Sequence, residues 1–177
     1  SAVRQGKALY VGISNYTKEQ TEKAYKILKE LKTPFVIHQP SYSMFNRWIE
    51  EDGLRDYANE IGIGIIAFSP LAQGLLTDKY LNGIPEDSRI AKRASSLSEK
   101  DLTPEKLDKI KALNEIAKRR GQTLAQLALV WVLREGKVTS VLIGASKPEQ
   151  IVENVRALNN SELSAEEIDA IENILSK

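Results

Sequence analysis

The chain of 177 residues contains no cysteine, which excludes disulfide bonds and thiolate metal sites. Its 25 basic and 24 acidic residues are interspersed, so it lacks the basic footprint that nucleic acids or anionic membranes need. No apolar run approaches the ~20 residues of a membrane span, and the first residues carry no signal-peptide segment. These absences favour a cytoplasmic enzyme or binding domain, with neither nucleic acid nor membrane as partner.

Four apolar, strand-like segments are present, and each leads into a short polar motif. The motifs occupy residues 12–15, 38–42, 68–71 and 143–146. In parallel α/β proteins, ligands bind outside the carboxyl ends of the strands. We therefore expect the four motifs to serve one site, although they lie far apart in the sequence.

The segments between the motifs have the periodicity and capping residues of helices. Strands are expected at residues 8–13, 34–39, 64–69 and 138–143, the first of them buried on both faces. Helices are expected after Thr17, at 53–61 with Gly62 as its stop, after Thr103 with Gly121 as its stop, after Thr123, from Pro148 and after Ser164. The helix after Thr123 contains the run 127–133, which is apolar nearly all round, so we expect it to be covered on several sides. No linker divides the chain, so residues 1–177 are interpreted as one domain.

Four βα units are too few to close a barrel. An eight-stranded parallel barrel typically takes ~250 residues, so this chain is expected to carry half of one. Residues 2–4 lead to the first strand without a capping signal, as expected for a chain that continues from a preceding helix. Residues 71–102 form a loop of unusual length, and such loops are often functional.

The motifs together resemble the carboxyl-terminal half of the aldo-keto reductases. The matching stretches are GISN at 12–15, HQPSYS at 38–43, FSPLAQGLLTDKY at 68–80 and LIGASKPEQIVEN at 142–154. The branch that they resemble most contains the potassium-channel beta subunits and the bacterial glyceraldehyde 3-phosphate reductases. The resemblance implies strands five to eight of a (β/α)8 TIM barrel, with residues 71–102 covering a bound cofactor.

Ser14, Asn15 and Gln39 are the residues that the resemblance assigns to the nicotinamide ring. Their donors and acceptors match the carboxamide, which must be held so that one ring face presents its hydride. A purely structural interpretation remains open for each residue alone. Ser14 and Asn15 would then only start the following helix, and Gln39 would satisfy a backbone group.

The resemblance also implies contacts further along the cofactor. Phe68 matches the aromatic residue that stacks on the nicotinamide, and it would otherwise be a core residue. The turn that follows contains small residues that let backbone N–H groups approach a pyrophosphate. Residues of this turn and the long loop assigned to the cofactor are Ser69, Pro70, Leu71, Gly74, Lys79 and Arg89. The alternative for Lys79 and Arg89 is ordinary surface charge.

The last motif is assigned to the adenosine end. Ser146 and Lys147 lie at an expected helix amino terminus, which favours an anion such as the 2′-phosphate of NADP. Gln150, Glu153 and Asn154 share a helix face and would reach the adenine or its ribose together. Two positions depart from the family pattern, because many members have arginine where Gln150 stands and commonly glycine where Asp78 stands.

No catalytic residue and no metal ligand is assigned within the chain. The family's proton donor is a tyrosine with a lysine, an aspartate and a histidine, all from the amino-terminal half. His38 and Tyr42 do not match those positions, and a tyrosine of ordinary pKa needs a neighbouring cation to act at neutral pH. Tyr42, Phe45 and Trp48 are expected to line part of the substrate pocket.

Two functions of different class follow from these residues. The first is an NADPH-dependent oxidoreductase that reduces aldehydes or ketones to alcohols, with this chain supplying most of the cofactor site. The second is a non-catalytic half-barrel that binds nucleotide or assembles with a partner. An unrelated phosphate-binding barrel is less well supported, since phosphate binding alone does not require the Ser-Asn and Gln motifs. The sequence does not identify the carbonyl substrate. It also leaves open whether the chain forms a homo-oligomer or pairs with a missing amino-terminal half.

Overall fold

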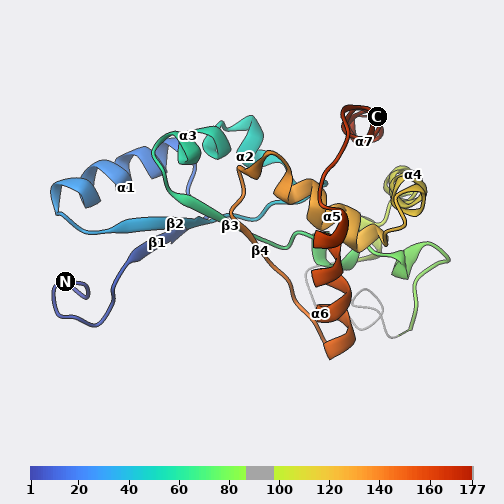
Figure 1. The fold of residues 1–177 in the computed structure, drawn as a ribbon, viewed down its shortest axis with the longest axis horizontal. Helices are drawn as coiled ribbons and strands as arrows, with labels where there is room; N and C mark the ends of the chain where they lie inside the picture. Colours follow the sequence, from blue (N-terminus) through green and yellow to red (C-terminus); the bar gives the residue numbers. More distant parts are fainter. Residues whose placement is uncertain (87–97, 177) are drawn as a thin grey trace. The chain divides into compact units, whose positions relative to one another are not determined.

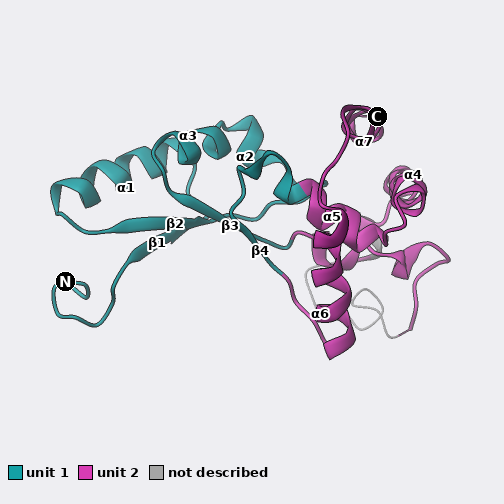
Figure 2. Ribbon diagram, in the orientation of Figure 1, with its two compact units in different colours: residues 1–69, 132–142 teal, residues 70–131, 143–177 magenta. Residues whose placement is uncertain are grey.

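The computed structural model describes residues 1–86 and 98–176. The chain forms two compact units, which Figure 2 colours separately. Unit 1 comprises residues 1–69 and 132–142, and unit 2 comprises residues 70–131 and 143–177. Each of them has its own buried core, so the two are described in turn.

Unit 1 is built on a sheet of four parallel strands in the order β1-β2-β3-β4 (Figure 1). The strands are β1 (Val11–Ser14), β2 (Phe35–Gln39), β3 (Gly64–Phe68) and β4 (Ser140–Leu142). Its helices are α1 (Lys18–Glu30), α2 (Trp48–Glu51), α3 (Leu54–Glu60) and the 3-10 turn η4 (Arg134–Gly136). The parallel order places the carboxyl ends of neighbouring strands on one sheet edge, as the motifs predicted.

The first strand differs from its prediction. It begins at Val11, and the preceding Leu9 and Tyr10 are 77% and 61% exposed. The expectation of a strand over 8–13 buried on both faces was therefore wrong. The physical reason is that β1 pairs only with β2 and is an outer strand of the described sheet, so residues 8–10 have no ladder to join.

Close backbone packing explains one glycine of β1. A Cβ atom at Gly12 would lie 2.6 Å from Cγ2 of Ile37 on the neighbouring strand, which no ordinary contact allows. Glycine is therefore required where β1 approaches β2. The same sequence motif thus serves strand pairing and the polar turn that follows.

The helix predicted over 53–61 is present as α3, and the short helix α2 precedes it. Gly53 has a φ of 73° and separates α2 from α3. Left-handed backbone cannot continue an α-helix, so the helix starts at Leu54. Gly62 also has a positive φ and follows the last turn of α3, which confirms it as the predicted stop.

Unit 2 is mainly helical. Its α-helices are α4 (Pro104–Arg119), α5 (Leu124–Leu133, whose last two residues belong to unit 1), α6 (Pro148–Val155) and α7 (Ala165–Leu175). Short 3-10 turns are η1 (Ala72–Gly74), η2 (Asp78–Tyr80), η3 (Glu99–Asp101) and η5 (Arg156–Asn160). Helix α5 is apolar nearly all round, and its Leu124, Leu127 and Trp131 are fully buried, as the sequence predicted.

Charged contacts join α4 to the end of the chain. Arg120, directly after α4, forms an ion pair with Glu167 of α7. The Lys109 ammonium donates to the Leu175 carbonyl oxygen at 2.8 Å. Since Ile110, Leu113 and Ile171 are buried beside these contacts, α4 and α7 form one packed pair within unit 2.

The predicted long loop contains no α-helix in its described part, residues 71–86 and 98–102, and it folds into η1, η2 and η3. In the part of the chain that the structure describes, no helix combines the length and hydrophobicity that crossing a bilayer would require. The loop is therefore a connection with its own short turns, placed between β3 and α4.

Candidate functional site

The carboxyl ends of β1 and β2 in unit 1 are tied together by hydrogen bonds. Ser14 lies opposite Gln39, and its hydroxyl donates to the Gln39 carbonyl oxygen at 2.7 Å. The backbone N–H of Asn15 donates to the same oxygen at 3.2 Å. The Asn15 side-chain oxygen accepts from the Ser41 N–H at 3.0 Å. These bonds fix the predicted residues at one end of the sheet.

The structure changes the purely structural interpretation of Ser14 and Asn15, whose side chains bond to the backbone of residues 39 and 41 and do not start helix α1. Helix α1 is capped by Thr17, whose hydroxyl accepts from the Gln20 N–H while the Gln20 side chain accepts from the Thr17 N–H. Ser14 and Asn15 are therefore not its caps. The half-buried Gln39 side chain makes no hydrogen bond with any described residue, so its amide is available to a ligand.

Phe68 is held beside the same strand end. Its N–H donates to the Pro40 carbonyl oxygen at 3.0 Å, and its own carbonyl oxygen accepts from the Tyr42 N–H at 3.2 Å. Ser69 follows with a φ of 55°, which turns the chain sharply where β3 ends. Non-glycine residues in this region cost about 1 kcal/mol or more, and such conformations cluster at functional sites.

A buried ionic network supports the segment that contains Gln39 and Ser41. The Glu50 carboxylate accepts from the Tyr42 hydroxyl, from Arg47 and, at 2.8 Å, from Arg134. Arg134 also donates to the Tyr42 hydroxyl oxygen at 2.9 Å. We call Tyr42, Arg47, Glu50 and Arg134 the Glu50 network. The predicted pocket-lining role was wrong for Tyr42, because its side chain is fully buried in this network.

The network shifts the pKa of both acidic members. Burial alone would raise the pKa of Glu50, but hydrogen bonds from Tyr42, Arg47 and Arg134 outweigh it and lower that pKa to about 2. Burial raises the pKa of Tyr42 to about 12, despite the neighbouring Arg134 charge. A tyrosine so raised is a poor proton donor at neutral pH, in agreement with its exclusion as a catalytic residue.

His38 is also a structural residue here. It is fully buried, and its Nε2 accepts from the Tyr16 N–H at 3.2 Å. Burial lowers the pKa of His38 to about 4, so the ring is neutral at pH 7. Its Nδ1 has no hydrogen-bond partner among the described residues. This geometry agrees with the rejection of His38 as a catalytic group.

Two lysines of unit 1 approach tyrosines, but not as a proton-transfer pair. Lys18 lies 5.9 Å from the centre of the Tyr57 ring, and Lys29 lies 5.6 Å from that of Tyr25. These are contacts with ring faces on helices, away from the strand ends. Burial raises the pKa of Tyr57, which is opposite to what a catalytic tyrosine needs.

In unit 2, the turn after β3 has an uncommon backbone. Ala72, Gln73 and Gly74 have φ values of 46°, 59° and 101°. The Gly74 N–H donates to the Leu71 carbonyl oxygen at 2.9 Å, and the Gly74 carbonyl oxygen accepts from the Thr77 hydroxyl at 2.7 Å. The Leu75 and Leu76 N–H groups likewise donate to the Ala72 and Leu71 carbonyl oxygens, so the turn pairs these N–H groups internally.

The remaining predicted residues of this stretch are only partly described. Pro70 is buried, whereas Lys79 is exposed on η2, whose first residue Asp78 is exposed as well. The prediction for Arg89 falls outside the described residues. The structure therefore places one of the two predicted phosphate-binding cations on the surface of unit 2.

The amino terminus of α6 is capped by the side chain of Gln150, a residue of the same helix. The Gln150 side-chain oxygen accepts from the Ser146 N–H at 2.8 Å and from the Lys147 N–H at 3.3 Å. An anion could use these N–H groups only by displacing Gln150. A glutamine three residues after an expected N-cap is a capping-box signal, so the sequence contained evidence for this contact.

Glu153 and Asn154 lie further along α6. The Glu153 carbonyl oxygen accepts from the Gln126 side chain at 2.8 Å, which joins α6 to α5. Asn154 is 8% exposed, and its side-chain amide has no hydrogen-bond partner among the described residues. Its amide atoms are not fully enclosed, so they can bond to water or to a ligand.

Parallel βα units with polar strand ends define a parallel α/β protein with a ligand site at the carboxyl edge of its sheet. Residues 1–176 match the Aldo/keto reductase family, and the chain belongs to that family. Members of this family reduce carbonyl compounds and generally use NAD(P)H.

Three relatives illustrate the match. L-glyceraldehyde 3-phosphate reductase of Escherichia coli O157:H7 is 54% identical over 97% of this chain and 50% of its own length. A putative voltage-gated potassium channel subunit beta of Schizosaccharomyces pombe is 39% identical over 98% of the chain and 52% of its own length. A probable subunit beta of Oryza sativa subsp. japonica is 36% identical over 98% of the chain and 54% of its own length. The chain thus spans about half the length of the curated relatives it matches.

Proposed function

We propose that this chain is the cofactor-binding half of an NADPH-dependent reductase that converts aldehydes or ketones to alcohols. Its four parallel strands would be strands five to eight of a (β/α)8 barrel. The observation that carries the proposal is the pair of unpaired amides at Gln39 and Asn154, which lie at positions assigned independently to the two ends of the cofactor. We refer to the barrel with both halves as the complete reductase.

Unit 1 would hold the nicotinamide end. When bound, the nicotinamide supplies the hydride that reduces the carbonyl carbon. The unpaired Gln39 amide and the Nδ2 group of Asn15 would bind the carboxamide and fix which ring face is presented. Phe68 would stack on the ring, and the Glu50 network would keep the segment from Gln39 to Tyr42 in place.

Unit 2 would hold the phosphates and the adenosine. The turn at η1, with Leu71 and Lys79, would lie beside the pyrophosphate. At α6, the Asn154 amide and the Glu153 carboxylate would bind the adenosine. The exposed Lys147 ammonium and the Ser146 hydroxyl would bind the 2′-phosphate and thereby favour NADPH over NADH.

The proton for the new alcohol would come from outside this chain. Burial raises the pKa of Tyr42 to about 12 and also raises the pKa of Tyr57, which makes both poor proton donors at neutral pH. The similarity to potassium channel beta subunits favours a second candidate, a non-catalytic subunit that binds nucleotide and assembles with a partner. Both candidates need the cofactor site, and only the first predicts carbonyl turnover.

Cofactor preference tests the proposal. In the complete reductase, NADPH should bind more tightly than NADH, and Lys147→Met should reduce that preference by roughly 1 to 2 kcal/mol, or about 5- to 30-fold. Fluorescence titration with both nucleotides measures it. Lys26→Met, which removes another exposed ammonium, is the matched control and should leave the preference unchanged. Equal affinities in the unmutated protein would contradict the assignment.

A further inference from the structure

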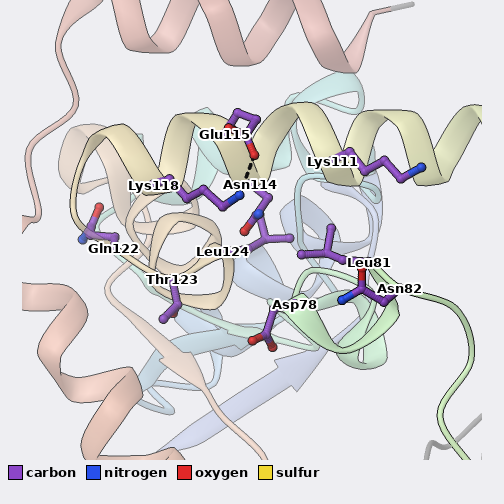
Figure 3. Close-up of a pocket in the computed structure, with 10 residues that line it drawn as sticks. All are labelled: Asp78, Leu81, Asn82, Lys111, Asn114, Glu115, Lys118, Gln122, Thr123 and Leu124. Atoms are coloured by element: carbon purple, nitrogen blue, oxygen red, sulfur yellow. Dashed lines mark hydrogen bonds and ion pairs between the residues drawn. The ribbon is translucent and has the colours of Figure 1, made fainter.

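Unit 2 contains a cavity that none of the predicted cofactor residues lines. It has a volume of about 600 Å³ and lies between η2, α4 and the start of α5 (Figure 3). We call it the α4–α5 cavity and define it by Asp78, Leu81, Asn114, Thr123 and Leu124. Its volume is in the range of small-molecule sites.

Asn114 is the feature that points to a ligand. Its side chain is 93% buried, being 7% exposed, and its amide makes no hydrogen bond with any described residue. Figure 3 shows this amide projecting from α4 toward Leu124 and the cavity. On α4 it interrupts a buried apolar face that includes Ile110, Leu113 and Ala117. The amide thus has no partner among the described residues and is open to bond with water or a ligand in the cavity.

The other walls supply complementary groups. The exposed Asp78 carboxylate has no hydrogen-bond partner among the described residues and is free to accept. The Thr123 hydroxyl oxygen already accepts from the Gln126 N–H at 3.3 Å, which leaves its O–H as a donor. Leu81 and Leu124 add an apolar surface. Asp78 also stands where the family commonly has glycine, so this carboxylate distinguishes the chain.

The charges of the cavity balance. Lys118 pairs with Glu115 at 2.7 Å. The other two charged lining residues, Lys111 and Asp78, have opposite charges, so the lining as a whole carries no net charge. In Figure 3 the Lys111 side chain extends away from Asn114. A strongly anionic or cationic ligand would therefore gain little from the site, whereas hydroxyl groups match its carboxylate, amide and hydroxyl.

We propose that the α4–α5 cavity binds a neutral polyhydroxylated molecule of monosaccharide size. The Asp78 carboxylate accepts hydrogen bonds from ligand hydroxyls, while the Asn114 amide both donates and accepts. Thr123 donates to a further oxygen, and the two leucines contact the C–H groups of the ring. This site would act in addition to the proposed cofactor site and does not depend on it.

Nuclear magnetic resonance of the ¹⁵N-labelled chain tests the proposal. D-ribose and D-glucose are titrated separately, with inorganic phosphate as an anionic probe and choline as a cationic probe. We expect a saturable shift of the Asn114 side-chain NH₂ signals with at least one sugar and none with the charged probes. Asp78→Asn should weaken the binding of that sugar at least ~10-fold, as expected for loss of one charge-assisted hydrogen bond. Asp169→Asn, the control at an exposed position on α7, should leave the affinity for the sugar unchanged.

Asn114→Leu provides the second test, since it should abolish sugar binding. If that variant does not fold, the Asp78→Asn comparison still decides, because Asp78 is exposed. Three results would overturn the proposal. The first is no saturable shift with either sugar, which would mean that the cavity holds only water. The others are binding of phosphate or choline instead of a sugar, and equal sugar affinity in Asp78→Asn.

Discussion

Replacement of Glu50 by glutamine should destabilise the chain by about 3–5 kcal/mol. The side chain keeps its shape but loses its charge, so the ion pair between Glu50 and Arg134, whose side chain is 7% exposed, is lost. Removing one partner of a buried pair typically costs this much, because the remaining charge stays buried. With a total stability of 5–15 kcal/mol expected for a domain, the effect would be large.

Urea unfolding followed by circular dichroism measures the difference, with the slope of the transition checked for each variant. Glu51→Gln is the matched control, since Glu51 is the exposed neighbour on α2 and should change stability by no more than ~0.5 kcal/mol. The triple variant Tyr42→Phe, Glu50→Leu, Arg134→Met should recover much of the loss, because the buried Arg134 charge is removed together with its partner. Equal midpoints for Glu50→Gln and Glu51→Gln would refute the argument.

Two further predictions concern His38 and the isolated chain. Since the folded pKa of His38 is about 4 and its ordinary value is 6.5, the unfolded state binds the proton first, and stability should fall as pH drops from about 6.5 to 4, by up to roughly 3 kcal/mol. His38→Gln should remove that part of the pH dependence in urea unfolding at pH 7 and pH 5, and an unchanged dependence would contradict it. The 177-residue chain alone should not oxidise NADPH in the presence of simple aldehydes, because general acid catalysis typically contributes ~10²- to 10⁴-fold. It should also self-associate through the open edges of β1 and β4, so a monodisperse monomer in light scattering that turns over aldehyde would refute this prediction.

Local signals predicted much of the fold. The caps at Thr17 and Ser164 and the stop at Gly121 were confirmed, because each depends on residues three or four positions apart or on a single left-handed residue. The apolar run of α5 likewise indicated burial on all sides. The ends of strands were less predictable, since the exposure of Leu9 and Tyr10 depends on which strands pair.

Contacts between distant residues account for what the sequence did not predict. Glu50 and Arg134 are 84 positions apart, and nothing in either local pattern indicates that they meet. Asn114 could have been noticed as a polar residue on an apolar helix face, but its missing partner is visible only in the folded chain. Gln150 was assigned to the adenosine, while its local spacing also favoured the capping contact that the structure shows.

Gln39 offers the most direct measurement of the central claim, that this chain orients the nicotinamide. In the complete reductase, Gln39→Ala should slow the single-turnover hydride step by roughly 10- to 100-fold while NADPH affinity changes little, since affinity comes mostly from the phosphate end. Gln5→Ala, at an exposed position outside the strands, should change neither quantity. An unchanged hydride step with only a raised dissociation constant would contradict the account.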